Sequence, residues 1–337
     1  MANENSLSRY IIGAYATSPN LVTWDEKSEL TYFNELKKLP SIRGLELPFW
    51  GESLHPFDDE WLLSNLDPKW ENVLTCVPGT MRRLDNDPYF GLASIKENSR
   101  IEAIKFYSKA LECVKILNNH FGVNKVLAVQ ITSAPTNIQG NLYAHKKLLF
   151  ESLSEIVSWD WFGSKIVIEH FDAAYEYNPI PKKGFLTLEE EIDTIIEINE
   201  KYDSNCGIVI NWGRSVIEFK NVEGPIKHIK DTIQHNVLCG LMFSGTSDND
   251  NNLYGAWSDL HMPPADYLDF QYFELESLMS FENIKNTLLA CDYNALDYLG
   301  IKLLAMPDES TIEKRIGINK DAMILLDHTV KEIDSGI

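Results

Sequence analysis

The chain has 337 residues, and its 50 acidic against 30 basic residues give a formal net charge of -20 at pH 7. This charge disfavours nucleic acid as a partner, because phosphate binding needs a basic surface. The hydrophobic fraction of 44% suits a globular protein with a sizeable core. No apolar run of about eighteen residues and no signal-peptide pattern occur, so we predict a cytoplasmic protein that makes no use of a membrane.

Short apolar runs rich in β-branched residues alternate with amphipathic stretches along the chain. The runs predict strands at residues 10–16, 42–47, 72–77, 125–132, 165–169, 207–211, 238–244 and 300–305. The amphipathic stretches predict helices at residues 100–121, 142–157, 188–202, 225–234 and 281–290. Thr187 and Glu190 form a capping-box pattern at the start of the third of these helices.

The alternation of strands and helices predicts an α/β fold with parallel strands, a (β/α)8 TIM barrel. The alternative is a doubly wound open sheet. That fold ordinarily has fewer strands and a glycine-rich first turn, whereas residues 14–20 here read AYATSPN. No linker or low-complexity segment divides the sequence, so we expect one domain over residues 1–337.

Candidate catalytic residues stand at the ends of predicted strands, where barrel enzymes carry their active sites. Glu169 closes the apolar run KIVIE, and Glu46 follows the second strand. Two carboxylates that meet in one cavity can divide the roles of acid and base. Glu169 could instead form a structural ion pair with Arg214. His170 follows Glu169 and, by strand alternation, is expected to point outwards to the helices.

Candidate substrate-binding residues follow the sixth and seventh strands. Asn211 can bind hydroxyl groups, and Arg214 offers a planar fork for a carboxylate or phosphate. Asp259 and His261 lie in the long loop at residues 244–264, which we expect to be an ordered lid. Trp212 and Trp257 could stack on a sugar ring, although core packing explains each of them equally well.

Five motifs, GAYATSP, LELPF, PGTMRRL, FGLAS and TSAPT, together with Glu169 at the end of the fifth strand, carry a resemblance to a known superfamily. The chain resembles the xylose isomerase-like TIM-barrel proteins, which include sugar isomerases, epimerases and endonuclease-type enzymes. The motifs look more specifically like an uncharacterised bacterial branch of that superfamily. The likeness covers nearly the whole chain.

The resemblance also implies a divalent metal site, held in the sugar epimerases by Glu, Asp, His and Glu on strands five to eight. Glu169 matches the first ligand, but Asn211 stands at the second, and Arg214 replaces the histidine expected three residues later. The seventh strand offers Phe243 and Ser244, and residues 303–305 of the eighth contain no carboxylate. A site for Mg, Mn or Zn rebuilt from Glu169 with Asp259 or His261 remains open, and we favour a metal-free arrangement.

The resemblance implies an enzyme that acts on a small carbohydrate or sugar acid by proton transfer next to a carbonyl, as an isomerase or epimerase does. Glu169 and Glu46 would then be the catalytic groups. The alternative from another class is a non-catalytic sugar-binding or regulatory barrel, which the replaced ligands favour. A DNA-repair nuclease is the third hypothesis, and the net charge argues against it. The sequence predicts no oligomeric state.

Overall fold

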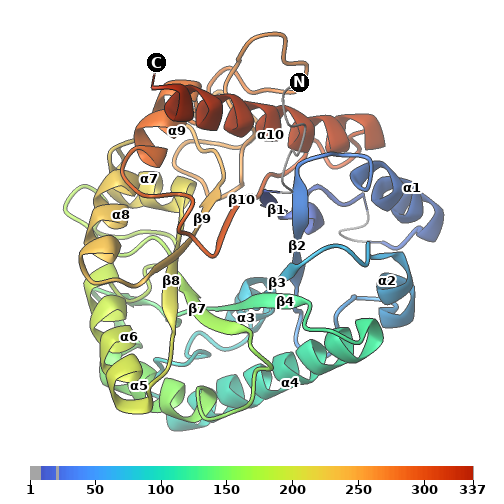
Figure 1. Cartoon of the computed structure of the whole chain (residues 1–337). Coiled ribbons are helices and arrows are strands. Elements are labelled where there is room, and N and C mark those ends of the chain that lie inside the picture. The colour runs from blue at the N-terminus through green and yellow to red at the C-terminus, as the bar shows by residue number, and fades with distance from the viewer. Residues whose placement is uncertain (1–8, 20–22, 337) are drawn as a thin grey trace.

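The computed structural model describes residues 9–19 and 23–336. Within these residues, eight parallel strands close into a barrel in the order β1-β2-β3-β4-β7-β8-β9-β10 (Figure 1). The strands are β1 (Tyr10–Ile12), β2 (Ile42–Pro48), β3 (Asn72–Thr75), β4 (Val126–Ile131), β7 (Lys165–Glu169), β8 (Gly207–Asn211), β9 (Leu238–Phe243) and β10 (Tyr298–Ile301). All eight predicted strands and the (β/α)8 barrel are therefore confirmed. They read as continuous apolar runs because both faces of the sheet are buried.

Helices surround the barrel, as Figure 1 shows. They are α1 (Glu26–Leu36), α2 (Asp59–Asn65), α3 (Val77–Leu84), α4 (Glu97–Phe121), α5 (Lys146–Ile156), α6 (Leu188–Tyr202), α7 (Trp212–Phe219), α8 (Gly224–Gln234), α9 (Phe281–Leu288) and α10 (Ile312–Ser335), with a short 3-10 helix η1 (Ala14–Thr17). The prediction for α6 is confirmed at both ends. Its capping box is formed, with Thr187 Oγ1 accepting from the Glu190 backbone N–H and Glu190 Oε2 accepting from that of Thr187.

The predicted start of α5 at residue 142 is wrong. Residues 141–142 form strand β6 (Asn141–Leu142), which pairs with β5 (Asn137–Ile138) in a small hairpin. Gly140 turns this hairpin at φ +90°, a conformation that glycine adopts without strain. The helix begins at Lys146, five residues after β6 starts, where the His145 side chain accepts from the Lys147 backbone N–H and caps it.

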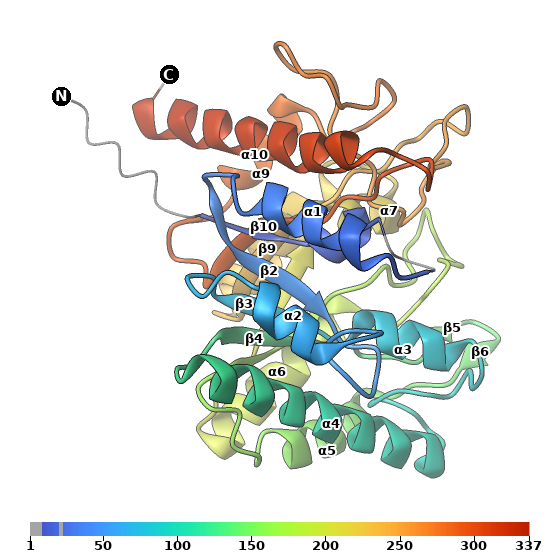
Figure 2. The same cartoon turned by 90° about the vertical axis from the view of Figure 1, so that its right-hand side faces the viewer.

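The carboxyl ends of the barrel strands lie on the side of the molecule that carries the β5–β6 hairpin (Figure 2). The longest irregular segment, residues 244–280, connects β9 to α9 and contains the predicted lid loop. Cys76, Cys206 and Cys239 are buried free thiols. In the part of the chain that the structure describes, none of the helices combines the length and apolar character needed to cross a membrane.

Candidate active site

Two buried carboxylates and one buried ammonium group meet at the mouth of the barrel. Glu46 lies near the end of β2, Glu169 is the last residue of β7, and Lys302 directly follows β10. Lys302 Nζ lies 2.9 Å from Glu46 Oε1 and 3.3 Å from Glu169 Oε1, so one ammonium group bridges both glutamates. All three side chains are fully buried. The two predicted catalytic residues are therefore neighbours in one charged cluster.

Lys302 is the residue of this cluster that the sequence analysis missed. It occupies the eighth strand position, where only the absence of a carboxylate was noted. A lysine inside the apolar run GIKLLA was the available signal, because a lysine is almost never fully buried without a partner. Gly13 makes room for it: a Cβ atom at residue 13 would lie 2.9 Å from Lys302 Cγ.

Arg214 extends the cluster towards the long loop. Its Nη1 atom lies 2.6 Å from Glu169 Oε1, and its Nε donates to Asp259 Oδ2 at 3.0 Å. The guanidinium also lies over the ring of Phe171, 3.7 Å from the centroid. Asp259 in turn pairs with Lys183 and with His261, whose Nδ1 lies 3.3 Å from Asp259 Oδ1. The ion pair between Glu169 and Arg214 is thus formed, as part of a larger network.

Asn211 joins the same network at the end of β8. Its Nδ2 donates to Glu169 Oε1 at 3.4 Å, and its Oδ1 accepts from Ser244 Oγ at 2.7 Å. Asn211 also caps α7, because its Oδ1 accepts from the backbone N–H of Arg214. One side chain therefore fixes both the start of the helix that carries Arg214 and the orientation of Glu169.

The surroundings of the two glutamates shift their pKa values in opposite directions. Burial raises the pKa of Glu46 above its ordinary value, with Lys302 opposing this change. Burial also acts on Glu169, but Arg214 and Lys302 outweigh it and lower the pKa of that carboxyl. Lys302 keeps its proton because the two glutamates overcome the effect of burial and raise its pKa. Burial lowers the pKa of His261 to about 3, so its ring is neutral.

Several buried polar atoms of this cluster find no hydrogen-bond partner among the described residues. They are both carboxylate oxygens of Glu46, Oε2 of Glu169, Nη1 of Arg214 and Nδ1 of His261. Glu46 Oε1 and Arg214 Nη1 take part in ion pairs, with Lys302 and Glu169, that are not aligned as hydrogen bonds. A buried polar atom without a partner costs about 1–3 kcal/mol, so such atoms are uncommon unless a ligand or water completes them.

The two tryptophans lie outside this network. Trp212 is fully buried in the core, and its indole N–H donates to Thr287 of α9 at 3.0 Å. Its contacts are with the helical layer, and this corrects the expectation that it reaches a sugar. Trp257 is partly buried in the long loop, where its backbone N–H donates to the carbonyl of Ser247. Trp212 therefore packs in the core, whereas contact of Trp257 with a sugar stays a prediction.

The donors at the barrel mouth do not fit a divalent cation. Three donors of Lys302, Arg214 and Asn211 already surround Glu169 Oε1. A divalent ion beside Glu169 would lie next to two groups that keep their positive charge, and charge repulsion opposes this. Among the described residues, Glu169, Asp259 and His261 do not bring their donor atoms close enough together to share one ion.

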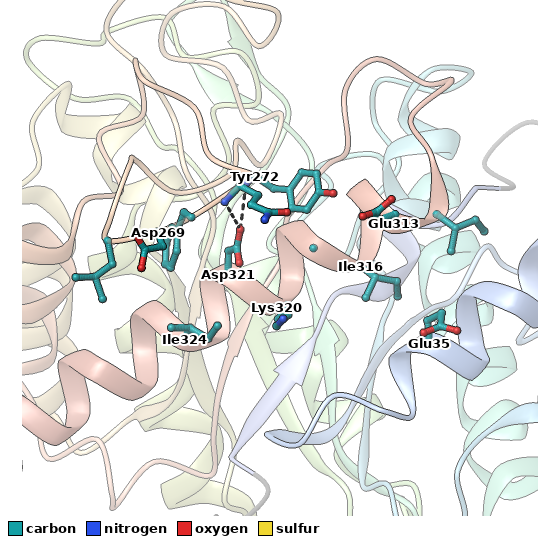
Figure 3. A pocket seen from close by; sticks show the side chains of 13 residues that line it. Glu35, Asp269, Tyr272, Glu313, Ile316, Lys320, Asp321 and Ile324 are labelled. Atoms are coloured by element: carbon teal, nitrogen blue, oxygen red, sulfur yellow. Dashed lines mark hydrogen bonds between the residues drawn. The ribbon is translucent and has the colours of Figure 1, made fainter.

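A small cavity of about 70 Å³ lies beside Glu46, between η1, β2, α1 and α2. The residues with polar side chains in its lining are Tyr15, Ser18, Glu29, Tyr32, Glu46, Trp50 and His55, and the other lining residues are apolar. A larger pocket of about 600 Å³ lies elsewhere (Figure 3). It is formed by α10, the segment at residues 268–272 and Glu35 of α1, and it contains none of the predicted site residues.

Comparison with known families and sequences gives two matches that cover most of the chain. A family model described as "Domain of unknown function (DUF4862)" matches residues 11–318. The uncharacterized protein STM3670 of Salmonella typhimurium is 35% identical over 317 residues, which are 94% of this chain and 96% of that protein.

Solved structures with the same fold are more distant in sequence. D-psicose 3-epimerase, solved in the presence of D-fructose, has a TM-score of 0.56 at 12% identity and covers 96% of this chain and 99% of its own. A sugar phosphate isomerase/epimerase of Parabacteroides distasonis has a TM-score of 0.52 at 15% identity, with 94% and 98% covered. At these identities, the likeness shows a xylose isomerase-like barrel fold.

Proposed function

The chain belongs to the family described as Domain of unknown function (DUF4862), and from that premise we propose that it is an isomerase or epimerase that acts by proton transfer next to a carbonyl. Its substrate is a small carbohydrate or sugar acid, and the barrel mouth works without a divalent cation. We also propose that the protein is cytoplasmic and that residues 1–337 form one domain.

One observation carries this proposal: two buried glutamates contact the same ammonium group, and their pKa values are shifted in opposite directions. Glu169 is held ionised and can accept a proton, whereas Glu46 retains a proton to higher pH and can donate one. Neighbouring carboxyl groups whose environments separate their pKa values are the usual sign of divided acid and base roles. Lys302 holds both groups in place.

In the proposed step, Glu169 removes a proton from the carbon next to the carbonyl. The electron pair of the broken C–H bond moves through the carbon–carbon bond to the carbonyl oxygen, which Lys302 and Arg214 stabilise as it becomes negative. Glu46 donates its proton to that oxygen. For the isomer, Glu169 returns its proton to the former carbonyl carbon while Glu46 takes the hydroxyl proton from the adjacent carbon. For the epimer, a solvent proton adds to the original carbon from the opposite face, Glu46 takes back the proton of the oxygen, and Glu169 releases its proton to solvent. Because Lys302 stays protonated, it acts as a charge and hydrogen-bond donor.

The remaining polar groups suit the hydroxyl groups of a sugar. The unpartnered oxygens of Glu46 and Glu169 can accept from hydroxyls, and Arg214 Nη1 can donate to a hydroxyl or a carboxylate. Asn211, Asp259 and His261 complete the binding side. The cavity beside Glu46 can take a terminal hydroxymethyl group. The sugar epimerases that share this fold support carbohydrate as the substrate class.

Proton NMR in D2O tests the proposal. Chelator-treated protein is incubated with D-fructose, D-glucose, D-xylose and D-glucuronate, and both conversion and deuterium uptake next to the carbonyl are followed. We expect uptake with one of these probes and its loss by at least a hundredfold in Glu46→Gln and in Glu169→Gln. Glu52→Gln is the matched control, because Glu52 is an exposed glutamate paired with Lys109. Undiminished uptake in both site variants would contradict the proposal.

The closed packing of the cluster favours one rival, a sugar-binding barrel without catalysis. Glu169 and Lys302 are completely inaccessible, so a ligand must reach them through movement of the surrounding loops. A rise in melting temperature with one of the same probes, without deuterium uptake, would support this rival.

A further inference from the structure

A second buried cluster of ionisable side chains lies behind strand β7, between the barrel and the helices. His170 follows Glu169 and points outwards, as strand alternation predicts. Its Nε2 atom lies 3.0 Å from Glu218 Oε2 on α7, and His228 Nε2 on α8 lies 3.4 Å from Glu218 Oε1. The three side chains are almost completely buried. Among the described residues, no hydrogen bond or ion pair joins them to the cluster at the barrel mouth.

We propose that His170, Glu218 and His228 form a zinc site that is separate from the barrel mouth and independent of the proposed reaction. One ligand atom from each residue lies within 4.8 Å of the other two. Two imidazoles and one carboxylate are a common zinc ligand set. Donors bound to one tetrahedral zinc ion at about 2.0–2.2 Å lie about 3.3–3.6 Å apart, so the three side chains must move closer by up to about 1.5 Å as the ion binds. The two imidazole rings are nearly perpendicular, with their centroids 4.8 Å apart, so both can direct Nε2 towards Glu218.

The Nδ1 atom of each histidine, which faces away from Glu218, already has a hydrogen-bond partner. His170 Nδ1 lies 2.7 Å from Glu191 Oε2, and His228 Nδ1 lies 2.9 Å from Ser215 Oγ. Glu191 is itself hydrogen-bonded by Ser133. Histidine ligands of metals are oriented in this way, by a carboxylate or hydroxyl on the nitrogen that faces away from the ion. The arrangement leaves both Nε2 atoms facing the carboxylate of Glu218.

The cluster is also reachable from the surface. Glu218 and His228 line a groove of about 420 Å³ between α6, α7 and α8, together with Tyr175, Phe219 and His235. An ion can enter through this groove, and a water molecule or small ligand can complete its coordination. Zinc binds neutral imidazole, so a proton carried by either Nε2 is released to solvent as the ion binds.

Calorimetric titration of Zn²⁺ into chelator-treated protein tests the site, with Co²⁺ absorption as a second measurement. We expect one equivalent to bind and visible Co²⁺ bands typical of four or five ligands. His228→Gln should abolish both signals, whereas His235→Gln, the same change at an exposed histidine of the same groove, should retain them. Glu169→Gln should also bind the metal normally, which distinguishes this site from the barrel mouth.

Two results would overturn the inference: no saturable Zn²⁺ binding by the wild-type protein, or His228→Gln that binds with wild-type affinity. If His228→Gln does not fold, Ser215→Ala decides, because it removes only the hydroxyl that orients His228. We expect a tenfold to hundredfold loss of affinity in that variant, and an unchanged affinity would count against the site. Isotope exchange with sugars tests the proposed function separately, so each proposal can fail alone.

Discussion

Glu169 ends strand β7 and His170 directly follows it, yet the two residues belong to clusters of different chemistry. Inside the barrel, Glu169 and Glu46 are balanced by Lys302 and Arg214, which keep their protons. Outside it, the carboxylate of Glu218 faces two histidines, which can exchange a proton for a metal ion. In our proposal, the type of cation beside a buried carboxylate decides whether a metal can enter. An ammonium or guanidinium group keeps its proton near neutral pH, whereas an imidazole can lose its proton and become a metal ligand.

The largest expected effect comes from removing the charge of Lys302 from the inner cluster, which comprises Glu46, Glu169, Arg214 and Lys302 at the barrel mouth. The outer cluster comprises His170, Glu218 and His228. Lys302→Met leaves Glu46 and Glu169 buried and without their shared cation, and breaking a buried pair in this way costs about 3–5 kcal/mol. Urea denaturation measures the loss. Lys109→Met removes an exposed lysine paired with Glu52 and should change stability very little. Equal effects in the two variants would contradict the account of the cluster.

The pH dependence of stability gives the next largest effect. Burial, helped by Lys302 and Arg214 against the opposing Asp259, lowers the pKa of His261 to about 3. In the unfolded chain this histidine titrates near pH ~6.5, so between these values only the unfolded state binds the proton. Stability should therefore fall as the pH drops from about 6.5 towards 3, by about 1.4 kcal/mol per pH unit from this residue.

Comparing urea midpoints at pH 7.5 and pH 5.5 isolates that contribution. His261→Gln should lose less stability on acidification than the wild type, whereas His235→Gln, at an exposed position, should behave like the wild type. A variant with the full wild-type pH dependence would show that His261 is not the buried neutral histidine that the structure describes.

Gly13→Ala is expected to disturb the inner cluster alone. The new Cβ atom would lie 2.9 Å from Lys302 Cγ, and overpacking of this kind costs about 1–3 kcal/mol. Gly13 has φ -71°, which alanine also adopts, so the cost arises from the contact and not from the backbone. Isotope exchange with the responsive sugar should fall, while Zn²⁺ binding should remain. Unchanged exchange would mean that the position of Lys302 does not matter to the reaction.

The smallest effects separate the two clusters most cleanly. Ser244→Ala removes the donor to Asn211 inside the barrel, and Ser133→Ala removes the donor to Glu191 outside it. Each change leaves a buried acceptor incomplete, at a cost of about 1–3 kcal/mol by thermal melting. Only Ser244→Ala should slow isotope exchange, because Asn211 contacts Glu169. Slower exchange in Ser133→Ala would show that the clusters are coupled.

The sequence predicted the barrel because its strands have a strong local signal. Both faces of the sheet are buried, so each strand reads as an apolar run. Helix α7 was missed for another reason: its eight residues form only about two turns and directly follow β8, so the segment is too short for a helical period to be read. Pro78 and Gly79 made α3 look like a turn. Helix α10 has Ile312, Ile316 and Met323 on one periodic face, so its signal was present and overlooked.

The site was predictable to the extent that strand ends converge. Four site residues lie at or just beyond strand ends: Glu46, Glu169, Asn211 and Arg214. The structure brings them together with Asp259 and His261. Lys183 could not be found in this way, because it lies in an irregular segment that only tertiary packing brings to Asp259. The outer cluster needed the same information, since Glu218 and His228 come from helices whose rotation about the barrel the sequence does not specify.

Titration of Mn²⁺ followed by electron paramagnetic resonance tests the central claim most directly, that Lys302 takes the place of a divalent cation between Glu46 and Glu169. Chelator-treated wild-type protein should show no Mn²⁺ bound at the barrel mouth, so Glu169→Gln should leave its titration unchanged. Lys302→Ala, which exposes the two carboxylates to each other, should gain a Mn²⁺ site. Wild-type binding that Glu169→Gln abolishes would contradict the account.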